Sequence, residues 1–263
     1  MITITNIIYF IVVFASCVLG ATVGLGGGMF VRPVFDAFGY HNVINISFFS
    51  SSAILTMAVV STIKKVKDGT KIDITVAVLV SMGAIFGGVL GNLFLEHLLG
   101  RFYVEAHVQL IQIAATIAVL TLSLFLTTKK NLRYEVKNKM FFAVLGSVMG
   151  MVGAFLGMGG GPINVPFFMI FFGLSIKDAT AYSIVIIFFA HLSRLITMGW
   201  TVGYGQFDLP VLLFIVPAAA LGGFVGAKVS KIFSESTVKK LFLATISSVI
   251  VLNLANGAFL MWR

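Results

Sequence analysis

Long apolar stretches separated by short polar segments dominate the chain. Six of them are long enough to cross about 30 Å of hydrocarbon as α-helices, which takes roughly 20 residues at about 1.5 Å per residue. Two further apolar regions, 6–38 and 141–173, are each interrupted by a glycine cluster, and each Gly costs about 0.8 to 1 kcal/mol relative to Ala inside a helix. The pattern therefore predicts six continuous transmembrane helices and two broken ones. The six continuous stretches are 43–63, 74–95, 107–126, 179–198, 209–227 and 241–262.

The two broken regions belong to an internal repeat. GLGGGMFVRPVF, which begins at Gly24, aligns without gaps with GMGGGPINVPFF, which begins at Gly157. Further along, GGVLG at 87–91 corresponds to GGFVG at 222–226. The chain is therefore predicted to consist of two homologous halves joined by a polar, basic linker. The first repeat, the linker and the second repeat are residues 1–128, 129–139 and 140–263.

The composition places the chain in the membrane class. Hydrophobic residues make up 59% and charged residues 10% of its 263 residues, and the mean hydropathy is +1.07. A soluble protein of this size has no interior large enough for so much apolar surface. The net charge of +9 resides mainly in lysines between apolar runs, where the cytoplasmic leaflet attracts them. The charge therefore indicates a lipid bilayer as partner, and no nucleic acid.

The distribution of basic residues predicts the topology. Lysines gather in 64–71, in the linker and in 228–240, whereas 96–105 and 199–208 contain a single Arg between them. If the basic segments are cytoplasmic, corresponding loops of the two halves lie on opposite faces, so each half crosses an odd number of times. We predict an all-α polytopic integral membrane protein with two inverted-topology repeats. Each repeat has three full transmembrane helices and one Gly-interrupted re-entrant hairpin, which gives eight helical membrane segments. The alternative is that the first arm of each hairpin spans the membrane.

The glycine clusters are the first candidate binding site. A backbone without Cβ atoms lets a small ligand approach the peptide N–H groups, and the helix N-terminus that follows carries about half a positive charge. The clusters lack the third glycine of a dinucleotide fingerprint and the Lys-Ser or Lys-Thr of a phosphate loop. The alternative role is close helix packing, which we also predict for GGVLG and GGFVG. The predicted tip residues are Gly26, Gly27, Gly28, Gly159, Gly160 and Gly161.

Polar residues on the helix 179–198 form a second group of candidates. Thr180, Ser183, His191 and Arg194 recur at helical spacing, which places them along one face. Ionisable residues inside a membrane are a functional hypothesis by default. His191 is interpreted as a pathway or proton-coupling residue. For Arg194 the alternatives are a pathway residue and an anchor that snorkels to the interface.

Four more polar residues complete the predicted substrate site. Asn45 and Ser47 belong to a polar seam on the corresponding helix of the first half, and Arg32 and Asn164 lie in the second arms of the two hairpins. The alternatives are helix-to-helix hydrogen bonding for the seam and snorkelling near Asp36 for Arg32. All four are predicted to contact a small anionic solute.

Enzymatic chemistry is not indicated. The sequence has no Ser/His/Asp constellation, no paired acids and no HExxH motif. The one cysteine, Cys17, excludes an internal disulfide framework and a cysteine-rich metal site. We therefore predict no catalytic residue, no metal site and no cofactor.

The duplicated signature resembles the sulfite exporter TauE/SafE family of bacterial and plant membrane permeases. The residues that carry the resemblance are the two glycine-led segments and the helix starts ATAYS at 179–183 and VINIS at 43–47. The resemblance implies a secondary transporter in the bacterial inner (plasma) membrane. It implies a small anionic substrate, such as sulfite, a sulfonate or another organosulfur compound or oxyanion. The predicted inverted repeats favour movement of this anion by alternating access. An anion channel with two re-entrant pore loops is the alternative. The identity of the anion, the direction of transport, the coupling ion and homo-oligomerisation stay open at this point.

Overall fold

The apolar runs of the sequence form helices, which satisfy every backbone polar group within one segment, as hydrocarbon requires. In the computed structural model, the described residues are 4–70, 72–101, 105–129, 134, 136, 138–156 and 160–261. This part of the chain contains α-helices and two short 3₁₀ turns but no strand. The α-helices are α1 (Ile4–Val23), α2 (Gly28–Phe38), α3 (Val43–Lys67), α4 (Ile74–Arg101), α5 (Glu105–Thr128), α6 (Lys139–Leu156), α7 (Gly161–Phe171), α8 (Ile176–Thr201), α9 (Leu212–Ile232) and α10 (Glu235–Met261).

Six helices match the six predicted spans. α3, α4, α5, α8, α9 and α10 are all long and apolar enough to cross a membrane, which confirms that prediction. α1 is a seventh such helix, with 20 residues, whereas α6 and α7 are shorter apolar helices. α1 therefore has the length required by the alternative in which the first arm of a hairpin spans.

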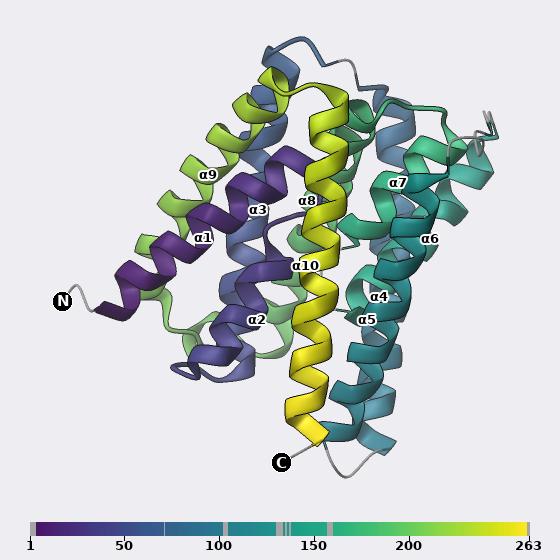
Figure 1. Cartoon of the computed structure of the whole chain (residues 1–263). Helices are drawn as coiled ribbons and strands as arrows, with labels where there is room; N and C mark the ends of the chain where they lie inside the picture. The colour runs from purple at the N-terminus through teal and green to yellow at the C-terminus, as the bar shows by residue number, and fades with distance from the viewer. Residues whose placement is uncertain are drawn as a thin grey trace.

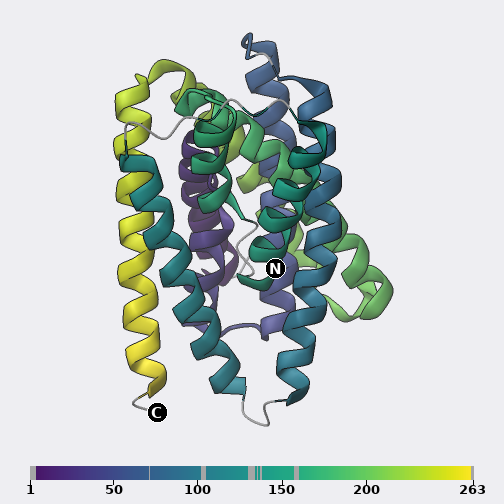
Figure 2. The ribbon, with the colours of Figure 1, turned by 90° about the vertical axis from the view of Figure 1, so that its right-hand side faces the viewer.

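The helices of the two halves pack in exchanged pairs. α4 of the first half packs along α6 of the second, and α9 of the second half packs along α1 of the first. α3 and α8 contact each other, α9 also packs on α3, and α4 on α8. The short helices α2 and α7 pack on α3 and α8, respectively. α5 and α10 pair along one edge (Figure 2).

Small residues make the two exchanged pairs close, as predicted for GGVLG and GGFVG. A Cβ added to Gly87 or Gly91 of α4 would collide with the backbone of α6 at Ser147 or Met151. On α9, a Cβ added to Gly222 would lie 2.7 Å from the carbonyl oxygen of Phe14 in α1. These glycines therefore serve helix crossing.

The two ends of the molecule differ in charge. The α3–α4, α7–α8 and α9–α10 connections lie at the top of Figure 1, next to Lys64, Lys177 and Lys231; we call this the basic end. The α2–α3 and α8–α9 connections and the C-terminus lie at the bottom, which we call the opposite end. α1 begins and α2 ends in the lower half of Figure 1, and α7 ends at the top.

Candidate functional site

The first glycine cluster is the turn at which the chain reverses between α1 and α2 (Figure 1). Gly24 and Gly26 have φ angles of +75° and +72°, which glycine adopts without strain. A Cβ added to Gly24 would lie 2.6 Å from Cα of Thr180. The absence of side chains therefore permits both the turn and its close approach to α8.

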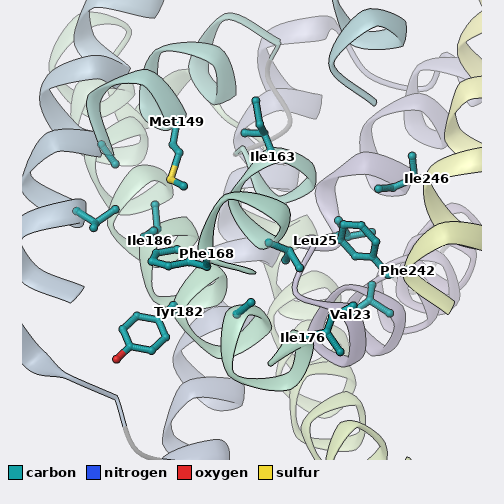
Figure 3. Packing of buried hydrophobic residues seen from close by; sticks show 14 of the residues in the cluster. Val23, Leu25, Met149, Ile163, Phe168, Ile176, Tyr182, Ile186, Phe242 and Ile246 are labelled. Carbon is teal, nitrogen blue, oxygen red and sulfur yellow. The ribbon is translucent and has the colours of Figure 1, made fainter. Parts of the chain in front are cut away.

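The second cluster begins α7 and meets the first. Gly160 is the N-cap of α7, with a φ of +75°, and Pro162 follows in the first turn, where its missing N–H has no cost. A Cβ added to Gly161 would collide with the carbonyl of Leu25 from the first cluster. Figure 3 shows Leu25 in the same apolar cluster as Ile163 of α7. The two tips are therefore in contact; Gly159 lies outside the described residues.

Peptide N–H groups at the first tip are available to a ligand. The N–H groups of four buried residues have no hydrogen-bond acceptor among the residues that the structure describes: Gly26, Gly27, Gly28 and Met29. Buried N–H groups in proteins are nearly always paired. The last two also form the positive N-terminus of α2. This cluster of donors has the chemistry of an anion site.

Thr180 and Ser183 of α8 hold the first tip. Ser183 Oγ donates a hydrogen bond to the Gly24 carbonyl oxygen at 2.6 Å. Thr180 Oγ1 donates to the Lys177 carbonyl oxygen at 2.7 Å and packs against Gly24. Both predicted residues therefore lie at the tip, but both hydroxyls donate to backbone carbonyls.

Asn164 and His191 are two of the buried polar side chains that have no hydrogen-bond partner within the described part of the chain; the hydroxyls of Ser61 and Ser81 are others. Asn164 of α7 is 0% exposed, and neither its Oδ1 nor its Nδ2 is hydrogen-bonded. Its Oδ1 would lie 3.2 Å from a Cβ added to Gly160, so the amide is at the second tip. His191 of α8 is 2% exposed, and neither ring nitrogen is hydrogen-bonded. A buried polar group without a partner costs about 1 to 3 kcal/mol, which points to a ligand or water at each place.

His191 faces a small cavity between α4, α6 and α8. The cavity has a volume of about 30 Å³ and is also lined by Asn92, Gly150, Gly153 and Arg194. Such a volume accommodates one or two water molecules. In this conformation the cavity is therefore too small for an oxyanion.

Arg32 and Arg194 bring positive charge to the same region. Arg194 Nη2 donates a 3.4 Å hydrogen bond to Ser47 Oγ of α3. Arg194 is close enough to Arg32 of α2 for their charges to repel each other, and close enough to His191 to interact with it as well. α2, α3 and α8 thus assemble three of the predicted residues, Arg32, Ser47 and Arg194, in one place.

Asn45 forms its hydrogen bonds at the opposite end of the molecule. Its Nδ2 donates to Asn42 Oδ1 at 2.9 Å, and its Oδ1 accepts a hydrogen bond from the Asp208 N–H at 3.1 Å. The bond from Asp208 ties the start of α3 to the α8–α9 connection at the opposite end. A role of Asn45 in binding stays a prediction.

Lys65 is a candidate that the sequence pattern does not indicate. We predicted it in the basic segment 64–71, but α3 continues to Lys67 and the Lys65 side chain is 6% exposed. Its Nζ donates to Thr180 Oγ1 at 3.1 Å and to Ser230 Oγ of α9 at 3.3 Å. These partners lie 115 and 165 residues away along the chain, so no local pattern indicates its burial.

Metal ligation has no candidate in the described ranges, where no group of three or more His, Cys, Asp or Glu side chains is placed to hold an ion.

The helical fold, with seven helices long enough to span, and the meeting of two glycine tips define a multi-pass membrane protein. The family description "Sulfite exporter TauE/SafE" matches residues 9–253, and the chain belongs to this family, as the sequence resemblance predicted.

Two curated relatives are both described as "Probable membrane transporter protein MamO". The one from Magnetospirillum gryphiswaldense is 31% identical over 114 residues, and the one from Paramagnetospirillum magneticum is 31% identical over 112 residues. Each match covers 41% of this chain and 18% of the relative, so the chain matches less than a fifth of these proteins' length. No solved structure matches the chain.

Proposed function

We propose that this protein is a secondary transporter that carries a small anion by alternating access, with the two glycine tips as its binding site. The observation that carries the proposal is the contact between the tips, at Leu25 and Gly161. Beside it lie backbone donors and the amide of Asn164, which have no partner among the described residues. The family and the description of the relatives as membrane transporters support transport as the activity and give no indication of catalysis.

The charge distribution supports an anion as the substrate. The site offers N–H donors, two arginines and the N-termini of α2 and α7, all of which favour negative charge. The acidic side chains that the structure describes lie at helix ends and connections instead: Asp68, Asp73, Asp178, Asp208 and Glu235. Family membership favours sulfite, a sulfonate or another sulfur oxyanion within this class.

The exchanged packing supports two inverted repeats. α4 on α6 and α9 on α1 are the pairs that a two-fold axis between the halves would relate. The lower-half position of the α1 start and the α2 end favours a hairpin that enters and leaves at the opposite end. With the basic end in the cytoplasm of a bacterium, this hairpin would enter from outside and the α6–α7 hairpin from inside.

Closure at both ends favours a carrier over a channel. At the opposite end, Tyr9 Oη is hydrogen-bonded to His41 Nδ1 at 2.9 Å, and His41 Nε2 lies 3.5 Å from Asp208 Oδ2. At the basic end, Lys65 joins α3 to α8 and α9. The described glycines of both tips are buried. Passage of an anion would then require the two halves to move relative to each other.

A flux assay in proteoliposomes tests the proposal. Purified protein is given sulfite, sulfate, thiosulfate, sulfoacetate and simple carboxylates in turn. We expect saturable uptake of at least one sulfur oxyanion and counterflow when the same anion is loaded inside. Non-saturating flux without counterflow would support the channel, and absence of flux for the whole panel would contradict anion transport.

A further inference from the structure

Two neighbouring lysines at the basic end have opposite environments. Lys64 Nζ lies 2.8 Å from Asp68 Oδ1, and the same carboxylate oxygen lies 3.3 Å from Lys231 Nζ. Lys65 is buried, and within the described part of the chain it forms no ion pair. The neutral hydroxyls of Thr180 and Ser230 are its hydrogen-bond partners.

The surroundings of Lys65 leave its charge uncompensated. Asp178 is the acid whose charge acts on Lys65, but it lies beyond ion-pair distance and accepts a hydrogen bond from Ser175 Oγ at 2.9 Å. Lys177 adds a repulsive positive charge. A buried ammonium with no counter-charge is costly, and an ammonium has three donors, of which two are used here. An anion would supply both the missing charge and the missing acceptor.

Lys65 is connected to the binding tip. Thr180, which accepts its hydrogen bond, is the residue against which Gly24 of the first tip packs. Lys65 is therefore linked to the proposed site through one residue, Thr180, and lies on the side of the site that faces the basic end. Arg194 is also on α8, but it lies toward the end of this helix that is opposite Thr180.

We propose that Lys65 is an anion-binding residue at the basic end of the transport pathway. When the pathway is empty, the hydroxyls of Thr180 and Ser230 accept two of the three hydrogen bonds of its ammonium. The translocated anion accepts the third, and it competes with the two hydroxyls as it passes between the first tip and the basic end. This inference rests on the proposed function, and it adds a second contact point for the same anion.

Substitution of the two lysines by glutamine tests the inference. In proteoliposomes with radiolabelled sulfite as the probe, and sulfate as a second probe, we expect Lys65→Gln to raise KM by about ten-fold or more, as loss of a charge-assisted hydrogen bond does. Lys64→Gln is the matched control and should leave KM unchanged. Lys65→Arg should keep KM within about three-fold of wild type, because it keeps the charge. Thermal stabilisation of the detergent-solubilised protein by sulfite should follow the same order.

The outcomes separate this inference from the proposed function. Equal KM values for wild type, Lys64→Gln and Lys65→Gln would overturn the role of Lys65 while transport itself stands. Absence of transport by the wild type would overturn the proposed function first. Should Lys65→Gln fail to fold, Ser230→Ala gives an independent test, because it removes a competing acceptor and should lower KM by about two- to ten-fold. A KM for Ser230→Ala that is unchanged or higher would then contradict the inference.

Discussion

The two glycine tips occupy matching positions in the repeat but carry different chemistry. At the first tip, Val31 and Arg32 follow the glycines, whereas Asn164 and Val165 stand at the same positions of the second. Val31, Asn164 and Val165 are each 0% exposed, and Arg32 is half-buried near Arg194. The first tip thus supplies charge and backbone N–H groups, and the second supplies a neutral amide. In the proposed anion site, each of the two matching segments would therefore supply a different part of the binding chemistry.

The largest effect we expect concerns the faces from which the tips enter. A reporter fused after Lys130 should be cytoplasmic, and one fused after Arg263 should be external, because an inverted arrangement puts them on opposite faces. The side of each fusion point is measured with two reporters, one that is active only in the cytoplasm and one that is active only outside. If both reporters lie on one side, the comparison of two inverted tips is invalid.

The next prediction concerns the contact between the two tips. Gly161→Val would push Leu25 away, since even a Cβ collides with its carbonyl. In enzymes a misplacement of about 1 Å costs on the order of 100-fold, and we expect a loss of flux of that order with membrane insertion intact. Gly257→Ala in α10 is the control, because its Cβ would meet only an ordinary 3.4 Å contact with Ile113. A Gly161→Val variant with normal flux would exclude the tips as the binding site.

Asn164 tests the contribution of the second tip. Asn164→Leu removes a buried amide that has no partner among the described residues, so the free energy of unfolding should stay the same or rise. The KM for the anion should rise by about ten-fold, because one hydrogen bond to a charged ligand is lost. Asn253→Leu in α10, where the amide donates to the Val249 carbonyl, is the matched control. An unchanged KM together with lower stability would assign Asn164 a structural role.

Arg32 tests the contribution of the first tip. Because Arg32 is only half-buried, screening limits its effect, and Arg32→Ala should raise KM by about five-fold, equivalent to about 1 kcal/mol. The difference from wild type should shrink as salt is added. Arg101→Ala at the exposed end of α4 controls for net charge. If Arg32→Ala leaves KM unaltered at low salt, Arg32 is an anchor at the membrane interface.

The smallest effect concerns the support of the first tip. Ser183→Ala removes the hydrogen bond to the Gly24 carbonyl and should lower the free energy of unfolding by about 1 kcal/mol, with flux changed by less than about two-fold. Ser248→Ala removes an exposed bond to the Ala244 carbonyl within α10 and should be near neutral. A ten-fold loss of flux in Ser183→Ala would show that its hydroxyl binds the substrate directly.

Much of the fold is predictable because the bilayer imposes a length on every span. Uninterrupted apolar runs of about 20 residues became long helices, and glycine clusters ended α1 and preceded α2 and α7. Helix crossing at Gly87 and Gly222 was also predictable, since small residues at a helix face permit close approach. The length of α1 was ambiguous, because an apolar arm of 20 residues fits either a hairpin or a span.

The candidate site was only partly predictable. Spacing indicated that Thr180, Ser183, His191 and Arg194 share a face of one helix, and all four are at least half-buried. Spacing gave no indication that Thr180 and Ser183 would hold the first tip while His191 stayed unpaired. Those outcomes depend on which distant segment packs on each turn of α8.

The sequence by itself determined that this chain is a membrane protein of the TauE/SafE family, since hydropathy and the repeated glycine signature are properties of the chain alone. Tertiary structure decided which polar groups lack a partner. Lys64 and Lys65 are adjacent and chemically identical, yet one is in a surface ion pair and the other is buried against α8 and α9. The physical reason is that the burial of a lysine and the presence of a counter-charge depend on helices that lie more than a hundred residues away along the sequence.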